Sequence, residues 1–317
     1  MIESKNAEYK AYAAAPFMMI VLYALASVFF WLTFKDMSTV IFFIILAIIF
    51  ISFMSLYAVV PIKVKNAIRI SCIFLISSLL FGLACILGRQ NFQIEGFFFY
   101  LLTGAFGGVI VHFIVGKIIG PLFTGRSWCS WGCWTLMILD LLPFKKSGGW
   151  KYGNINKLKY IHLVLSLALV AVMVFIFKYS LHDPKQAPDQ PGLIKAMYWF
   201  LIGNGFYYFS GIVLAIPLKD NRAFCKYLCP VSVLLKFSNL FSLLRIKGNK
   251  EKCARCNTCV GQCPFNIDIP KYIEEGTRIK SSECVMCMRC VAVCPEGALC
   301  SSIGFDVVTR DYLKIAK

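Results

Sequence analysis

Long apolar runs separated by short polar segments fill the first two thirds of the chain. Six runs reach the length of about 20 residues that a helix needs to cross a bilayer. They cover roughly residues 11–34, 39–60, 67–88, 96–119, 160–178 and 195–217. The pattern predicts a mostly α-helical bundle with about six transmembrane helices. Beyond residue 250 the chain becomes polar and rich in cysteine, which indicates a small separate domain.

Composition agrees with a membrane location. The chain of 317 residues is 59% hydrophobic and only 15% charged, as expected for a protein embedded in lipid. The first apolar run is long enough to cross the bilayer and lacks a small-residue cleavage site. We therefore interpret it as a retained helix and not as a signal peptide.

The net charge of +17 is distributed unevenly between the two sides of the predicted membrane. Basic residues follow the second run and fill the connection 117–159, whereas the turns near 35–36 and 89–95 are close to neutral. This asymmetry predicts cytoplasmic N and C termini in a multi-pass protein of the inner membrane. It also explains the charge without nucleic acid, because no basic stripe interleaved with aromatics lies outside the membrane flanks.

We divide the chain into four parts: N-terminal transmembrane helices at 1–94, transmembrane helices with two cysteine pairs at 95–249, a metal-binding domain at 250–300, and a tail at 301–317. The connection 117–159 is expected at the cytoplasmic surface. The stretch 231–244 has the apolar face and basic end of an amphipathic helix that lies in the membrane interface.

A repeat within the second part contains the cysteine pairs. Both copies read Arg, any residue, aromatic, Cys, any residue, aromatic, any residue, Cys; the first runs from Arg126 to Cys133 and the second from Arg222 to Cys229. Each copy follows a membrane run. Two such units related by a pseudo-twofold axis could bring four thiols together.

The strongest motif lies in the third part. Two runs of the form C-x2-C-x2-C-x3-C-P occur, the arrangement of bacterial two-cluster ferredoxins, in which the fourth Cys of each run binds the other cluster. The first cluster would be held by Cys253, Cys256, Cys259 and Cys294, and the second by Cys284, Cys287, Cys290 and Cys263. A zinc ribbon needs only four thiols. We therefore predict an α+β ferredoxin-like domain with two 4Fe-4S clusters.

The four cysteines of the repeat, Cys129, Cys133, Cys225 and Cys229, allow more than one interpretation. If each pair lies on a helical turn, its two thiols share a face, and the four thiolates could hold a further iron-sulfur cluster. The alternatives are buried structural thiols or a dithiol that carries electrons without metal. Because the Arg and aromatic residues repeat with the cysteines, we favour the metal centre.

Several single residues have both a structural and a functional interpretation. Arg126 and Arg222 could stabilise an anionic cluster or follow from the positive-inside rule. The motif aromatics are expected as interfacial anchors; they are Trp128, Trp131, Trp134, Phe224 and Tyr227. His112 is expected to be a satisfied interhelical histidine, with hydrogen bonding to a quinone as the alternative.

The remaining candidates are expected to be structural. We predict that Cys72, Cys85 and Cys300 are small buried hydrophobic residues. His162 opens the fifth run and His182 lies on the outer side, so a bis-histidine haem is unsupported. Asp140 is expected to be a solvated acid near the interface, with proton transfer as the alternative.

At these motifs the sequence resembles the membrane ferredoxin group that includes NapH of periplasmic nitrate reduction, MauN, the CcoG and RdxA proteins, and the polyferredoxin half of NosR. The resemblance covers residues 95–300 approximately. Cys229 is followed by Pro230, as in the family pattern, whereas Trp134 stands at the equivalent place in the first motif. The resemblance implies electron transfer between the quinone pool or a membrane partner and a redox enzyme.

Three hypotheses follow. The first is an electron-transfer subunit without substrate chemistry of its own, whose partners are other redox subunits, a quinone, or soluble ferredoxin or flavodoxin. The second is a metal reductase or maturation factor, for example one that reduces copper. The third is a transporter with a regulatory ferredoxin, which would need ionisable residues at mid-bilayer; the predicted runs supply only His112.

Overall fold

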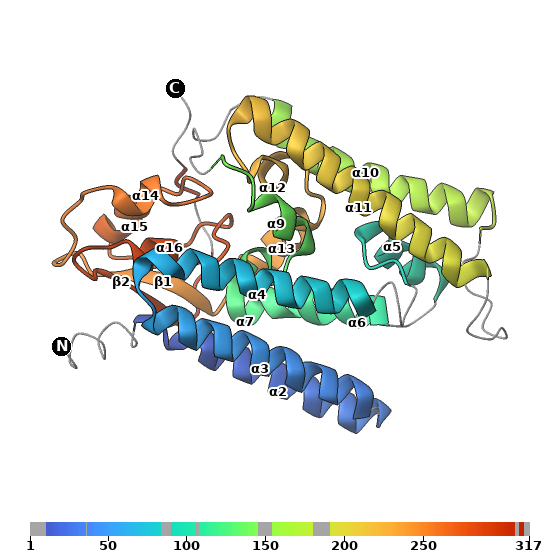
Figure 1. Cartoon of the computed structure of the whole chain (residues 1–317), viewed down its shortest axis with the longest axis horizontal. Coiled ribbons are helices and arrows are strands. Elements are labelled where there is room, and N and C mark those ends of the chain that lie inside the picture. Colours follow the sequence, from blue (N-terminus) through green and yellow to red (C-terminus); the bar gives the residue numbers. More distant parts are fainter. Residues whose placement is uncertain are drawn as a thin grey trace.

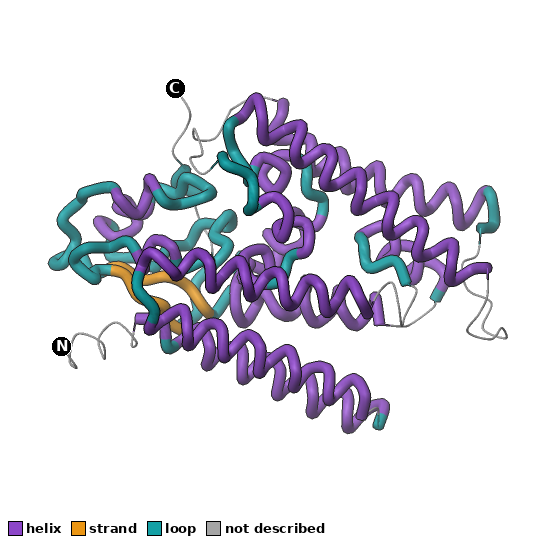
Figure 2. The backbone as a smooth tube through the Cα atoms, viewed as in Figure 1, coloured by secondary structure: helices purple, strands orange, loops and turns teal. Residues whose placement is uncertain are grey.

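The computed structural model describes residues 11–35, 37–83, 90–104, 108–144, 154–179, 191–307 and 311–313. Helices dominate, and one small sheet lies at one end of the molecule (Figure 1, Figure 2). Six helical segments are long and apolar enough to cross a membrane: Ala14–Thr33, Met37–Val59, Ile62–Gly82, Gly108–Leu139, Leu158–Ile176 and Lys195–Leu218. The prediction of a six-helix membrane bundle is confirmed.

The first three spans are regular helices. Helices α2 (Ala14–Phe34) and α3 (Met37–Val59) form a hairpin in which Tyr23 stacks on Phe50 at 5.9 Å between ring centroids. Helix α4 (Ile62–Gly82) follows Pro61, which occupies the N-cap position. Proline suits a helix start because the first N–H groups have no partner within the helix.

The fourth predicted run, 96–119, is wrong as a single helix. Helix α5 (Ile94–Thr103) ends at Gly104, whose φ of 69° belongs to the left-handed region that glycine adopts at little cost. The span itself begins at Gly108 and extends well beyond residue 119. It consists of α6 (Gly108–Phe113), the π-helix η2 (Ile114–Ile119), α7 (Gly120–Thr124), η3 (Gly125–Ser127), α8 (Trp128–Trp131) and α9 (Trp134–Leu139).

This change relocates the first cysteine pair. We expected it in a surface connection over 117–159, but it lies in the last part of the fourth span. The predicted span ended at residue 119, because Lys117 and Arg126 lower the hydropathy of the chain beyond it. Both side chains are buried in the protein, at 4% and 0% exposure, so neither ends the span by reaching water.

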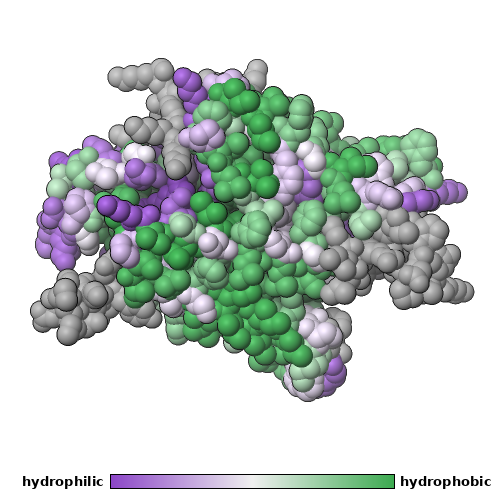
Figure 3. Space-filling model, viewed as in Figure 1, coloured by the Kyte–Doolittle hydropathy of each residue, from purple (hydrophilic) through white to green (hydrophobic). Residues whose placement is uncertain are grey.

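The last two spans lie side by side along one edge of the molecule (Figure 1). They are α10 (Leu158–Ala171), flanked by η4 (Asn154–Lys157) and η5 (Val172–Ile176), and α11 (Pro191–Leu218). Large apolar side chains point outward from both, including Val164, Ile202 and Phe209. Figure 3 shows this apolar surface over the helices and a hydrophilic surface at the opposite, cysteine-rich end. Such an outward face suits lipid contact.

Short elements follow α11. Helix α12 (Ala223–Tyr227) carries the second cysteine motif, and α13 (Val231–Asn239) comes next. The amphipathic helix expected over 231–244 therefore ends at Asn239. The remaining residues lead into strand β1 (Leu244–Gly248), which pairs antiparallel with β2 (Leu299–Ile303), Leu244 opposite Ile303. The alternation of β1 was too short to be recognised within an apolar stretch.

Between the two strands lie the ferredoxin motifs and the short helices α14 (Thr258–Gly261), α15 (Ile269–Glu274) and α16 (Arg289–Ala292). This domain shares one hydrophobic core with the membrane helices. The core runs from Tyr23 and Phe50 through Trp131 to Val285 and Met286. The cysteine-rich domain is thus packed directly on the bundle.

Candidate metal centres

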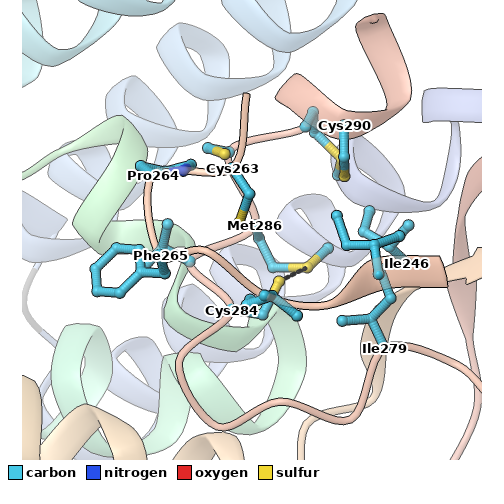
Figure 4. A pocket seen from close by; sticks show the side chains of 13 residues that line it. Ile246, Cys263, Pro264, Phe265, Ile279, Cys284, Met286 and Cys290 are labelled. Atoms are coloured by element: carbon cyan, nitrogen blue, oxygen red, sulfur yellow. Dashed lines mark hydrogen bonds between the residues drawn. The ribbon is translucent and has the colours of Figure 1, made fainter. Parts of the chain in front are cut away.

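Two cavities in the C-terminal domain are each lined by four cysteines. The first is lined by Cys263, Cys284, Cys287 and Cys290. Figure 4 shows Cys263, Cys284 and Cys290 around this space, with Phe265, Ile246 and Ile279 nearby. The other is lined by Cys253, Cys256, Cys259 and Cys294. In each cavity, three cysteines of one run therefore meet the fourth cysteine of the other run.

The two ligand loops have the same unusual backbone. Arg255 and Asn257, on either side of Cys256, have φ of 53° and 59°; Met286 and Met288, on either side of Cys287, have φ of 49° and 59°. Left-handed conformations cost roughly 1–2 kcal/mol for residues other than glycine. Two non-glycine residues in each loop adopt them at matching positions, which curves the chain around the cavity and directs its sulfur atoms inward.

The surroundings of the two cavities differ. Apart from its cysteines, the Cys284 cavity is lined by apolar residues such as Phe265, Ile267 and Val285. Burial raises the pKa of Cys284 to about 12. The other cavity reaches the surface, because Cys256 is exposed, and hydrogen bonding from Thr258 lowers the pKa of Cys256. We call the first, whose lining residues are mostly buried, the enclosed cavity, and the second, whose Cys256 is exposed, the open cavity.

The arrangement suits a cluster better than a single ion. Within the described residues, no three His, Cys, Asp or Glu side chains converge closely enough to hold one metal ion. The cysteines instead surround a cavity. A tetrahedral zinc site would require four ligands about 2.3 Å from a common centre, whereas a cubane occupies the space between four more widely separated sulfur atoms. The residues therefore fit a 4Fe-4S group.

The repeat cysteines are also gathered in one place, on broken helices. Cys129 lies in α8, but Cys133 is extended, with φ −85° and ψ 117°, because the helix stops at Gly132. The expected single helical turn with both thiols on one face is therefore wrong for the first pair. In the second motif Cys225 lies in α12, which ends before Cys229. In both motifs the helix therefore ends before the second cysteine.

Charge interactions connect the two pairs. Burial raises the pKa of Cys225 and Cys229, and repulsion from Cys133 and Cys129 adds to it. Lys117 interacts with the charges of Cys133, Cys129 and Cys229, while its ammonium group lies 4.0 Å from the centroid of the Trp128 ring. All four thiols thus lie in one neighbourhood, next to a buried cation. We call them the four-thiol group.

Arg126 of the first motif anchors the C-terminal domain. Its Nη1 donates to Glu283 Oε2 at 2.6 Å and to the Ser282 carbonyl at 3.1 Å. Lys159 and Lys236 donate to Glu283 Oε1 at 3.0 and 3.1 Å. These cations outweigh the desolvation that would raise its pKa and hold the pKa of Glu283 far below its usual range. We call Glu283 and its three cations the docking clasp.

Arg222 of the second motif has a matching role. Its Nη2 donates to Asp140 at 3.1 Å, and Arg69 donates to the same oxygen at 2.5 Å. Asp140 is only 7% exposed, so the expectation of a solvated acid is wrong. Burial alone would raise the pKa of Asp140, but Arg222 and Arg69 lower it. Arg222 also donates to the Cys129 carbonyl at 3.3 Å, which joins the two motifs.

The motif aromatics are buried and do not line a headgroup region. Exposure is between 1% and 8% for all five, Trp128, Trp131, Trp134, Phe224 and Tyr227. Trp131 donates from Nε1 to the Met286 carbonyl at 3.1 Å, inside a ligand loop of the C-terminal domain. The prediction of interfacial anchors is wrong, because the C-terminal domain covers Trp131, while Trp134 packs on Phe200 and Phe224 on Tyr207 inside the bundle.

The remaining predicted residues have varied surroundings. His112 lies among Phe92, Phe113, Trp128 and Trp134, and its Nε2 has no hydrogen-bond partner among the described residues, so the expected interhelical hydrogen bond of this nitrogen is not present within them. His162 Nδ1 lies 2.8 Å from the Leu228 carbonyl. Among the lone cysteines, Cys72 is buried and Cys300 half-buried. Cys85 and His182 fall outside the described residues.

Sequence reasoning missed Glu95, which we had assigned to an outer turn. It lies in the first turn of α5, and its Oε1 accepts a hydrogen bond from Ser166 of α10 at 2.7 Å. The signal was weak, since a single acid next to an apolar run is typical of a helix end. The predicted run began at residue 96, after Glu95, whereas α5 begins at Ile94 and includes Glu95.

Comparison with known proteins agrees with this geometry. Residues 252–299 match a 4Fe-4S dicluster domain family. An uncharacterized protein of Methanocaldococcus jannaschii is 28% identical over 230 residues, 65% of this chain and 80% of that protein. The methylamine utilization ferredoxin-type protein MauN of Paracoccus denitrificans is 29% identical over 201 residues, 59% and 68% of the two chains. The ferredoxin-type protein NapH of Escherichia coli is 23% identical over 223 residues, 66% and 68%. No solved structure matches.

A helical membrane bundle that carries a 4Fe-4S dicluster domain defines a multi-pass iron-sulfur protein of electron transport. Its relatives bear the names of ferredoxin-type proteins. In this combination the chain is similar to the NapH and MauN type of membrane-bound ferredoxin proteins.

Proposed function

We propose that the chain relays electrons through three iron-sulfur centres between a soluble or associated redox enzyme and a quinone or protein partner in the membrane. Two 4Fe-4S clusters would occupy the C-terminal domain. Cluster one would be bound by Cys253, Cys256, Cys259 and Cys294, and cluster two by Cys263, Cys284, Cys287 and Cys290. A third centre would be bound by the four-thiol group. When bound, the clusters supply one-electron redox chemistry.

The observation that carries the proposal is the pair of four-cysteine cavities. Their linings match the exchange of the fourth ligand that is typical of two-cluster ferredoxins. The open cavity, at exposed Cys256, suits contact with a soluble partner. The enclosed cavity adjoins the bundle, where Trp131 and Arg126 bind its ligand loop. We infer the order cluster one, cluster two, third centre.

Buried charge supports a third centre. Lys117, Arg126 and Arg222 lie around the four thiols, and Arg126 Nε, Arg126 Nη2 and Arg222 Nε have no hydrogen-bond partner in the described part of the chain. Arg126 is paired with Glu283 and Arg222 with Asp140, so what remains unsatisfied is a set of buried guanidinium N–H groups. Buried donors without partners are costly. Four thiolates and an iron-sulfur core would supply acceptors and negative charge for them. Arg222 also interacts with the charge of Cys287 of cluster two, so the two sites would be neighbours.

The positive-inside pattern supports a cytoplasmic position for the ferredoxin domain. The relay would then join the cytoplasmic side to the interior of the membrane. A spheroplast protease assay tests this part: cleavage within 250–307 only after lysis supports it, and cleavage of intact spheroplasts contradicts it.

Anaerobic purification followed by iron analysis and electron paramagnetic resonance (EPR) tests the relay. We expect at least about eight iron atoms per chain from two cubanes, and more with the third centre. Cys225→Ser should remove the third signal and leave the two ferredoxin signals. Cys300→Ser is the matched control, since Cys300 lines neither cavity. An iron count below eight would contradict the two clusters, and an unchanged spectrum in Cys225→Ser would contradict the third centre.

A further inference from the structure

A carboxylate lies within the membrane domain at the half of the bundle away from the ferredoxin. Helix α5 has 10 residues, about 15 Å in length and too short to cross a bilayer. It lies between α10 and α6 (Figure 1). Its first turn carries Glu95. Oxygen Oε1 accepts from Ser166, whereas Oε2 is buried without a hydrogen-bond partner among the described residues.

Tyr207 connects this carboxylate to the four-thiol group. Its side chain is 5% exposed and its hydroxyl is buried. The hydroxyl interacts with Glu95 and also with Cys229 and Cys133, and the side chain belongs to one packed cluster with both of these cysteines. The ring packs on Phe224 of the second motif at 5.1 Å between centroids. One side chain therefore separates the acid from the third centre.

Further polar groups lie on the neighbouring segments. Asn204, one turn before Tyr207 on α11, has an Oδ1 without a partner in the described chain. Gln93, two residues before Glu95, packs against the backbone of Gly203, where a Cβ atom would lie 1.8 Å from its Oε1. This part of the bundle is therefore more polar than its apolar surroundings, and the Ser166 hydroxyl bonds Glu95 directly.

The charged and titratable groups on the elements around α5 are few. On α6 it is His112, held among aromatic rings, and η5 has none. On α10 they are Lys159, Tyr160 and His162. Lys159 binds Glu283, and His162 contacts the Leu228 carbonyl. On α11 they are Lys195, Tyr198, Tyr207 and Tyr208. No described cation forms an ion pair with Glu95. The negative charge of this carboxylate is therefore not compensated by a cation on the surrounding elements that the structure describes.

An ionisable side chain in this position is costly and is by default a functional candidate. An electron added to a buried centre is equally costly, because charges interact strongly where the dielectric constant is low. A proton taken up nearby would offset the added electron.

We propose that Glu95 is a proton-exchange group coupled through Tyr207 to the third centre. The centre gains one electron from the ferredoxin clusters, and the Glu95 carboxylate gains one proton from solvent; oxidation of the centre reverses both steps. The net charge of this part of the membrane domain then stays constant through each turnover. The inference rests on the proposed third centre.

Redox titration of the third EPR signal at several pH values tests the coupling. For a one-electron couple a tenfold change corresponds to 59 mV, so uptake of one proton should lower the midpoint potential by about 59 mV per pH unit. Glu95→Gln should keep the signal and make the potential nearly independent of pH. Glu275→Gln, an exposed acid that accepts from Tyr312, should keep the wild-type slope.

Infrared difference spectroscopy gives a second measurement that needs no variant to fold. Reduction of the wild type should add the C=O stretching band of a protonated carboxyl group. A pH-independent potential in the wild type, absence of that band, or a full slope in Glu95→Gln would each overturn the coupling while the third signal remains. Absence of the third signal would instead overturn the third centre itself, and with it the coupling.

Discussion

Glu283→Gln should separate the ferredoxin domain from the bundle. The carboxylate is 2% exposed and accepts from Arg126, Lys159 and Lys236 at 2.6, 3.0 and 3.1 Å. Removal of one partner of a buried ion pair costs about 3–5 kcal/mol, because the remaining charge stays buried. In Glu283→Gln, both Arg126 and Lys159 would stay buried without the carboxylate. Lys236 is 27% exposed, so its ion pair adds nothing further to this free-energy cost. At 1.4 kcal/mol per tenfold, the undocked population should rise about 10²- to 4 × 10³-fold.

Amide hydrogen exchange measures this population. Residues 284–290 pack against the bundle through the Trp131 bond to Met286, so their exchange should accelerate when the domain undocks. The matched control is Glu274→Gln, which removes an ion pair with Arg255 whose side chains are 48% and 67% exposed. Exposed pairs contribute about 0–1 kcal/mol, so exchange in this variant should change by less than about fivefold.

Iron content must be measured on both variants, because loss of cluster two would also accelerate exchange. If Glu283→Gln retains its iron and exchanges at the rate of Glu274→Gln, then the clasp does not hold the domain in place. The reasoning from buried charge would then be refuted.

Three further predictions concern strain, pH and exposure. Gly125 has φ 64° and ψ −160°, a region open almost only to glycine, so Gly125→Ala should cost about 1–3 kcal/mol in thermal unfolding. Asp140 has a lowered pKa in the folded protein; its contribution is complete above the unfolded pKa, about 3.9, and is lost as pH falls below it. Wild type and Asp140→Asn should therefore differ most at pH 5–7 and converge in acid, and a constant difference in unfolding temperature would contradict this. Cys256 is exposed, so ferricyanide should destroy cluster one before cluster two, and simultaneous loss of both EPR signals would contradict it.

The sequence predicted the architecture wherever a pattern has one physical cause. Twenty apolar residues in a row are stable as a membrane helix because all backbone groups are then paired internally. Six such runs predicted six spans, and six segments of the required length and hydropathy are present. The two cavities group the cysteines as the two-cluster ferredoxin pattern groups them, and the assignment of those cysteines as cluster ligands stays a prediction.

Burial of charge could not be predicted in the same way. Arg126, Arg222 and Asp140 look like flanking polar residues in a sequence, because a charge normally reaches water. Arg126 is buried against the ferredoxin domain, which supplies Glu283 from more than 150 positions further along the chain. Asp140 and Arg222 are buried against each other and Arg69, from a helix 71 positions before Asp140. Local patterns do not record contacts across such separations.

Broken helices were the other limit. The fourth run was predicted to be one helix because hydropathy is insensitive to where the backbone turns. Gly104 ends α5, and Gly132 ends α8 just before Cys133. Both are single residues within apolar surroundings. Glu95 lies on the short helix that Gly104 ends, and Cys133 follows Gly132 directly, so these candidate residues lie where the helical pattern fails.

The position of Glu283 directly before Cys284 links two contacts through one peptide bond. The docking carboxylate and the first cysteine of the second motif share one stretch of backbone, and the loop that follows adopts left-handed conformations at Met286 and Met288, which cost roughly 1–2 kcal/mol each. A movement of this loop would therefore shift Glu283 relative to Arg126 and Lys159, so that the shape of the cysteine loop and the attachment of the domain to the bundle depend on each other.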